Sequence, residues 1–210
     1  MVSGANRDES LDWVVPLTLP RHQIADATHF RSTWITASQA TLRARGHYAG
    51  YEALLAPAQR ELVLSTVAGM WLPMEIADAH YTACNALDLP TNELLEIGAA
   101  ATRRANATHL AFVARLSQGA GVTPWTILSQ IQRVWERTFK GGGQVGVVRL
   151  GPKDARFEII GYPLARLRYN RVTMRGIVHG FVELFCTKTY VKELPKLCDA
   201  RCIGLHLSWV

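Results

Sequence analysis

The chain has 210 residues, and 49% of them are hydrophobic, which is enough for a packed core and excludes a disordered protein. No apolar run approaches the roughly 18 residues that a transmembrane helix needs. The first residues also lack the basic and apolar regions of a signal peptide. We therefore expect a cytoplasmic protein without a membrane span.

The net charge of +6 is unevenly distributed along the chain. Residues 1–105 contain 8 Lys and Arg against 11 Asp and Glu, whereas residues 106–210 contain 15 against 6. A basic second half favours an anionic ligand, an acidic protein or nucleic acid, without choosing among them.

A triple glycine, Gly141, Gly142 and Gly143, separates two hydrophobic patterns. Before it, apolar residues recur with helical spacing; after it, they alternate as in strands. We predict an N-terminal arm over residues 1–24 and a single α+β domain over residues 25–210. Within this domain, residues 25–140 are expected to form a mainly helical layer that packs on a mainly antiparallel sheet over residues 144–210.

The apolar segment 13–20 is interrupted twice by proline, so it suits an extended arm or an edge strand. Five helices are then predicted, each from apolar residues at helical spacing behind a capping residue or a proline. The first of them carries Phe30 and Trp34 on one side. The predicted helices begin near Asp26, Pro57, Pro73, Thr91 and Thr123.

Strands are predicted after the glycines. Gly151 and Pro152 mark a turn between two short alternating runs, which indicates a hairpin. Residues 181–186 and 203–209 also alternate, whereas residues 171–180 suit either a strand or a helix. Four or more strands with short connections predict an antiparallel sheet.

Residues 141–146 match the G-x-G-x-x-G pattern of dinucleotide-binding proteins. In those proteins the motif follows a strand and begins a helix, whose N-terminus binds the phosphates. Here a helix is predicted before the glycines and a strand after them. We therefore interpret the glycines as a helix-to-strand junction and not as a nucleotide site.

The candidate ligand-binding residues are aromatic residues and histidines in apolar helical segments. Aromatic rings supply contact area and histidines supply polar recognition in a mostly apolar pocket. Either His80 or His109 could ligate a haem iron, although a buried histidine more often bonds a backbone carbonyl. Core packing is the alternative role for every member of the set. The predicted lining is Trp71, His80, Tyr81, His109, Phe112 and Trp135.

Four cysteines are too few for a secreted disulfide framework in a chain of this length, so reduced thiols are expected. Cys186, Cys198, Cys202 and His206 offer ligand types that suit zinc. Structural zinc sites use tighter paired spacings, and His206 belongs to a predicted strand. We therefore expect ordinary thiols and no metal site.

The densest basic run contains Arg166, Arg168 and Arg171, and the first two would share one face of a strand. This basic sheet face is the candidate for binding an anion or an acidic partner protein. No helix-turn-helix or aromatic sheet signature accompanies it, so nucleic acid is not expected. The common catalytic motifs, such as G-x-S-x-G, the Walker loop and H-E-x-x-H, are missing too, which favours a protein that is not an enzyme.

The order of these parts resembles the superfamily of haem-NO-binding domains, vinyl-reductase-type sensor domains and small subunits of the TRAPP trafficking complex. The resemblance covers residues 25–210 and is carried by residues 92–98, Thr123-Pro124, Gly151-Pro152 and residues 198–209. The chain looks most like a paralogous family of unknown function that is abundant in myxobacteria. Gly46, Tyr51, Leu54 and Leu55 carry this narrower resemblance.

The resemblance implies an apolar pocket between helices and sheet, which relatives use for haem, aromatic effectors or acyl chains. The haem-binding branch anchors its propionates with a Tyr-x-Ser-x-Arg motif that we do not find here, so we expect no cofactor, with haem and zinc as alternatives. The leading hypothesis is a non-enzymatic sensory or regulatory module that binds a small apolar or aromatic molecule, as a homodimer. The alternative is a protein-interaction adaptor that uses the basic sheet face and has no ligand.

Overall fold

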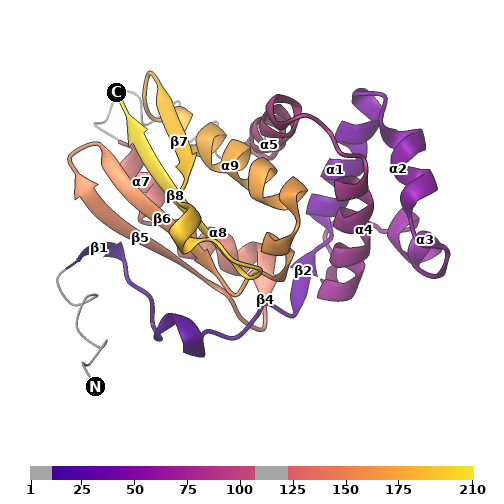
Figure 1. The fold of residues 1–210 in the computed structure, drawn as a ribbon, viewed down its shortest axis with the longest axis horizontal. Helices are drawn as coiled ribbons and strands as arrows, with labels where there is room; N and C mark the ends of the chain where they lie inside the picture. Colours follow the sequence, from indigo (N-terminus) through magenta and orange to yellow (C-terminus); the bar gives the residue numbers. More distant parts are fainter. Residues whose placement is uncertain (1–10, 107–122) are drawn as a thin grey trace.

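The computed structural model describes residues 11–106 and 123–210. Its first half is a helical layer, which Figure 1 shows beside the sheet formed by the second half. Pro57 and Thr91 are the first residues of their helices, as predicted, and the residue after Pro73 begins a third. The layer contains α1 (Thr33–Ala44), α2 (Tyr48–Leu54), α3 (Pro57–Leu64), α4 (Met74–Ala86) and α5 (Thr91–Asn106).

A five-stranded antiparallel sheet has the order β1-β5-β6-β8-β7. The predicted hairpin is present, because β5 and β6 pair in register on either side of a turn at Pro152 and Lys153. The apolar segment near the N-terminus forms the edge strand that pairs with β5. The strands are β1 (Asp12–Val15), β5 (Gln144–Gly151), β6 (Asp154–Ile160), β7 (Thr189–Glu193) and β8 (Cys202–Trp209). The predicted fold class, a helical layer packed on an antiparallel sheet, is therefore confirmed.

A long helix, α9 (Arg168–Glu183), lies where part of the sheet was predicted. The prediction of a strand over residues 181–186 is wrong, because the short alternation there is the end of a helical stripe. That stripe faces the interior at positions 170, 173, 174, 177, 178 and 181, a spacing of three and four residues. A short 3-10 helix, η2 (Pro163–Arg166), leads into α9, which lies between the sheet and α4 and α5 (Figure 1).

Two further predictions differ in detail from the structure. Phe30 belongs to β2 (His29–Arg31) and not to a helix, because it pairs with both β3 (Trp71–Pro73) and β4 (Phe139–Lys140) in a small second sheet. The helix predicted from Thr123 is two helices, α7 (Pro124–Leu128) and α8 (Ile131–Thr138). Thr123 does cap the first, through a reciprocal capping box with Thr126.

The triple glycine joins β4 to β5 and packs closely against the N-terminal segment. Gly143 has a φ of +74°, donates a backbone hydrogen bond to Ala25 (2.8 Å), and leaves no room for a Cβ beside the ring of Trp135. A side chain would therefore be both strained and obstructed at this position. The glycines lead into a strand, as the sequence predicted, but they follow the short strand β4 and not directly the helix α8.

A buried carboxylate, that of Glu158, anchors the N-terminal segment to the sheet through an ion pair. Glu158 on β6 is 1% exposed and forms ion pairs with Arg21 and with Arg156, the latter at 2.6 Å. Arg21 belongs to a short 3-10 helix, η1 (Arg21–Gln23), so this pair links the segment to the centre of the sheet. Within the described residues, no helix is long and apolar enough to cross a membrane.

Candidate functional site

A cavity of about 90 Å³ lies between the helical layer and the sheet. Its walls come from β2, α1, α4, α8, β4, β5, β6 and α9, so both halves of the chain are needed to form it. Nearly all of the lining side chains are apolar or aromatic. They are Phe30, Trp34, Tyr81, Ile131, Val134, Trp135, Thr138, Phe139, Val145, Phe157, Ile159, Tyr162, Asn170, Thr173, Met174, Ile177, Val178 and Phe181.

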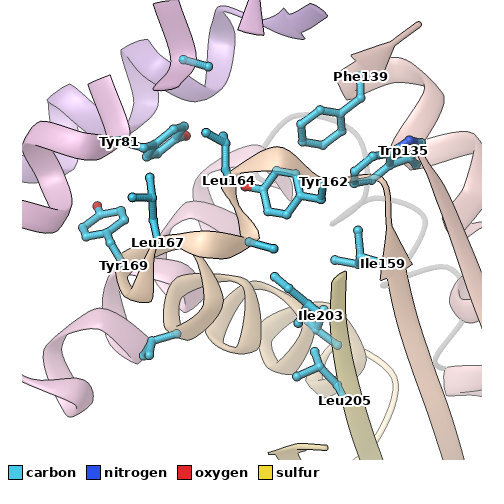
Figure 2. Close-up of a cluster of buried hydrophobic side chains, with 14 of the residues drawn as sticks. Tyr81, Trp135, Phe139, Ile159, Tyr162, Leu164, Leu167, Tyr169, Ile203 and Leu205 are labelled. Carbon is cyan, nitrogen blue, oxygen red and sulfur yellow. The ribbon is translucent and has the colours of Figure 1, made fainter. Parts of the chain in front are cut away.

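Aromatic rings form one side of the cavity. The rings of Trp135 and Phe139 are stacked with centroids 3.9 Å apart, and Tyr162 meets both of them edge to face. Figure 2 shows these three side chains grouped together, with Tyr81 further along the same cluster. Phe30 connects the two parts, because its ring lies 5.2 Å from Phe139 and 5.8 Å from Tyr81. Such a wall gives a flat ligand large contact area.

One polar pair lies in this otherwise apolar lining. Asn170 Nδ2 donates a hydrogen bond of 2.8 Å to the hydroxyl of Tyr162, and both residues are almost completely buried. Burial raises the pKa of Tyr162, so its hydroxyl stays protonated. Thr173 also lines the cavity, but its hydroxyl donates to the backbone carbonyl of Tyr169 at 2.9 Å.

A second cavity of about 40 Å³ adjoins the first. The two share the side chains of Trp34, Tyr81, Thr173 and Ile177, so these residues form a partition between them.

Of the six predicted lining residues, Tyr81 and Trp135 line the cavity. His80 does not, because it faces into the helical layer. There its Nδ1 is 2.6 Å from the hydroxyl of Tyr51, and its Nε2 is 3.6 Å from Cys84 Sγ. Complete burial lowers the pKa of His80 to about 3, so the ring is neutral at physiological pH.

Trp71 also lies away from the cavity wall. Its ring is covered by two cations, with Arg31 Cζ 4.6 Å and Lys140 Nζ 4.2 Å from the centroid. These cation–π contacts link all three strands of the small sheet, since Arg31 is on β2, Trp71 on β3 and Lys140 on β4. His109 and Phe112 lie outside the described residues, so their placement stays a prediction.

The three predicted anion-binding arginines do not lie on a strand face. Arg166 ends η2 and forms an ion pair with Asp78, while Arg168 and Arg171 are in the first turn of α9. Arg168 donates to the carbonyl of Leu89 and the hydroxyl of Thr91, both at 2.9 Å. The prediction that Arg166 and Arg168 share a strand face is therefore wrong, because residues 163–166 and 168–183 are helical. Binding of an anion or an acidic partner by these arginines stays a prediction.

The candidate zinc ligands have separate partners. His206 Nε2 is 2.6 Å from Asp154, Cys186 Sγ is 2.9 Å from the hydroxyl of Thr189, and Cys198 is near the backbone of Gly204. Over residues 11–106 and 123–210, no three His, Cys, Asp or Glu side chains are grouped so that they could hold a metal ion.

Tyr162, Asn170 and Phe139 line the cavity but were not among the residues predicted from the sequence. Asn170 could have been found, since it begins the stripe of α9 positions that faces the cavity and is the most polar member of that stripe. The signal was hidden because residues 171–180 suited a strand equally well. Tyr162 lies in a connection between elements, where hydrophobic periodicity carries no information.

Several solved haem-NO-binding (H-NOX) domains resemble this chain in structure. One, described in connection with haem distortion in the H-NOX family, has a TM-score of 0.58 at 11% identity and covers 85% of this chain and 94% of its own. An oxygen-binding H-NOX domain related to soluble guanylate cyclases has a TM-score of 0.55 at 12% identity, with the same coverage. A variant of the T. tengcongensis H-NOX domain has a TM-score of 0.56 at 10% identity, covering 85% and 97%.

No protein-family model and no curated protein matches the sequence. The expectation of no cofactor is contradicted by the structural neighbours, because they are described as haem-containing domains. At identities of 10 to 12%, the likeness itself concerns the fold. The chain therefore has the fold of the haem-NO-binding H-NOX domains.

Proposed function

We propose that this chain is a sensory domain that binds a small, largely apolar molecule in the cavity between the helical layer and the sheet. The observation that carries the proposal is the cavity itself, at about 90 Å³ with an aromatic and aliphatic lining. Protein interiors are close-packed, and voids larger than a water molecule are few. An apolar cavity of about 150 Å³ is large enough to bind benzene.

The structural neighbours contain haem, so haem is a candidate ligand for this chain as well. The apolar walls suit a porphyrin, but the described lining contains no His or Cys for iron and no Arg or Lys for propionates. Its volume is also below the roughly 300 Å³ at which typical ligand sites begin. The described residues therefore do not fit haem by themselves. His80 is engaged elsewhere, which leaves His109 as the other histidine that the sequence offered for haem iron.

A spectrum of the purified protein separates these cases. We would express the chain with a haem precursor and record the Soret region before and after reduction. A Soret band that His109→Ala abolishes and His80→Gln retains would assign haem to His109. Whether or not a Soret band is present, mass spectrometry of the denatured protein would identify any other small molecule that had co-purified.

A cavity-filling variant tests the proposed site directly. Val178→Phe places a ring in the cavity, so it should abolish binding of small apolar probes such as furan while the chain remains folded. Val67→Phe makes the same change at a side chain that is 65% exposed, and it should leave binding intact. Unchanged binding by Val178→Phe would contradict the proposal.

The sensory role requires that binding changes the state of the domain. The cavity lies against both α8 and α9, so hydrogen exchange in these helices should slow when a ligand is bound.

We also propose that the chain forms a homodimer and belongs to the paralogous family that is abundant in myxobacteria. Light scattering at several protein concentrations, with and without ligand, would measure the oligomeric state.

A further inference from the structure

The polar pair in the cavity has an unused hydrogen-bond acceptor. Asn170 lies in the first turn of α9, is 3% exposed and lines the cavity. Its Nδ2 donates to Tyr162, but no described residue donates a hydrogen bond to its Oδ1. Buried carbonyl oxygens in native proteins almost always have a partner, because an unpaired one is destabilising.

Three donors in the cavity wall are already engaged in other hydrogen bonds. Trp135 Nε1 donates to a backbone carbonyl at 3.3 Å, and the hydroxyls of Thr138 and Thr173 donate to carbonyls of their own helices at 3.1 and 2.9 Å. None of these three donors is free to turn toward Asn170 without breaking its present bond. The partner of the amide oxygen must therefore come from outside this set.

Building on the proposed function, we infer that the ligand is a neutral, mostly apolar molecule with one hydrogen-bond donor, and that the donor binds Asn170 Oδ1. Tyr162 orients the amide by accepting its Nδ2 proton, so the oxygen is the atom left for the ligand. The described lining carries no charged side chain, which makes a charged ligand far more costly to bury than a neutral one. The aromatic side chains of the cavity wall contact the apolar part of the ligand.

The volume of the cavity further limits the class of ligand. The cavity, at about 90 Å³, is smaller than the roughly 150 Å³ that accommodates benzene. A five-membered ring or a short chain therefore suits the space better than a larger ring. The inferred ligands are small molecules with a single O–H or N–H group.

Pyrrole and furan form a matched pair of probes, because they have the same ring size and only pyrrole has an N–H donor. Titration calorimetry or ligand-observed NMR should show that the wild-type chain binds pyrrole roughly tenfold more tightly than furan. Equal affinities would overturn this inference, because water would then satisfy Asn170 Oδ1, while the proposed cavity function would stand. Failure of both probes to bind would overturn the cavity function and this inference with it.

Substitutions test whether Asn170 is the residue that distinguishes pyrrole from furan. Asn170→Leu removes the acceptor and keeps the same branching and number of side-chain heavy atoms, so the ratio of pyrrole to furan affinity should fall to about one. Thr173→Val changes another polar lining residue and should keep the ratio, whatever it does to both affinities. Tyr162→Phe should lower the ratio, because the amide loses its fixed orientation. A ratio that survives in Asn170→Leu would overturn the inference; if that variant does not fold, Asn170→Ala gives the same comparison.

Discussion

The hydroxyl of Tyr51 on α2 lies 2.6 Å from Nδ1 of His80 on α4, and both side chains are fully buried. When the hydroxyl donates to Nδ1, the ring carries its proton on Nε2, which faces Cys84 Sγ at 3.6 Å. Both ring nitrogens are thus used inside the helical layer. His80 connects two helices and has no free nitrogen for a ligand.

Removing the Tyr51 hydroxyl should destabilise the fold. Tyr51→Phe keeps the ring but leaves a buried nitrogen without its partner, which costs about 1–3 kcal/mol. The free energy of unfolding in urea, followed by circular dichroism, measures this. Tyr190→Phe, at a side chain that is 46% exposed, should change it little. Equal stability of Tyr51→Phe and wild type would show that the hydrogen bond does not stabilise the layer.

His80 should also make stability depend on pH in one direction. Burial lowers its pKa from 6.5 to about 3, so the unfolded chain takes up a proton that the folded chain does not. The contribution of neutral His80 is complete above pH 6.5 and is lost as the pH falls from there through about 3. The slope approaches about 1.4 kcal/mol per pH unit for one proton.

Urea unfolding of wild type and His80→Gln between pH 7.5 and 4.5 isolates this contribution. All other groups are common to the two proteins, so the difference between the two curves reports His80. The wild-type advantage should shrink as the pH falls. A constant difference over this range would mean that His80 takes up its proton equally in the folded and unfolded chains, so that its pKa is not lowered by folding.

The sequence predicted the helix starts near Pro57, Pro73 and Thr91 because proline and capping residues act locally. It did not predict α9 over residues 181–183, because a short alternating run suits a strand until its tertiary neighbours are known. Phe30 was assigned to a helix for a similar reason, since its strand partners lie more than 40 residues away in β3 and more than 100 away in β4.

The candidate site was harder to predict than the fold. Aromatic residues on apolar segments are equally suited to a cavity wall and to a packed core, so Tyr81 and His80 could not be distinguished although they are adjacent in sequence. The structure separates them, because adjacent helical residues point about 100° apart. Tyr81 lines the cavity, whereas His80 faces Tyr51.

Arg168 should contribute to stability. Its guanidinium donates one hydrogen bond to Leu89, between α4 and α5, and one to Thr91, the first residue of α5. The side chain is 41% exposed, so we expect Arg168→Ala to cost only about 1 kcal/mol. Thermal unfolding measures this, with the exposed Lys196→Ala as the control. Loss of a partner protein in a pull-down, with unchanged stability, would instead support a binding role for Arg168.

The crossing of α5 and α9 should tolerate no side chain at its glycines. A Cβ at Gly176 would overlap the carbonyl oxygen of Leu95, and one at Gly98 would overlap that of Thr173, so each helix packs directly against the backbone of the other. Since these atoms are backbone and cannot turn aside, Gly176→Ala must separate the helices. We expect a loss of about 3 kcal/mol or more in the free energy of unfolding, despite the higher helix propensity of alanine.

The matched control is Gly50→Ala in α2, where the atom nearest to the new Cβ is the movable end of Leu87 at 3.3 Å. This variant should be nearly neutral. Because Gly98 and Thr173 also line the smaller cavity, Gly176→Ala should weaken binding of small probes as well. A Gly176→Ala chain as stable as wild type would show that α5 and α9 do not pack this closely in solution.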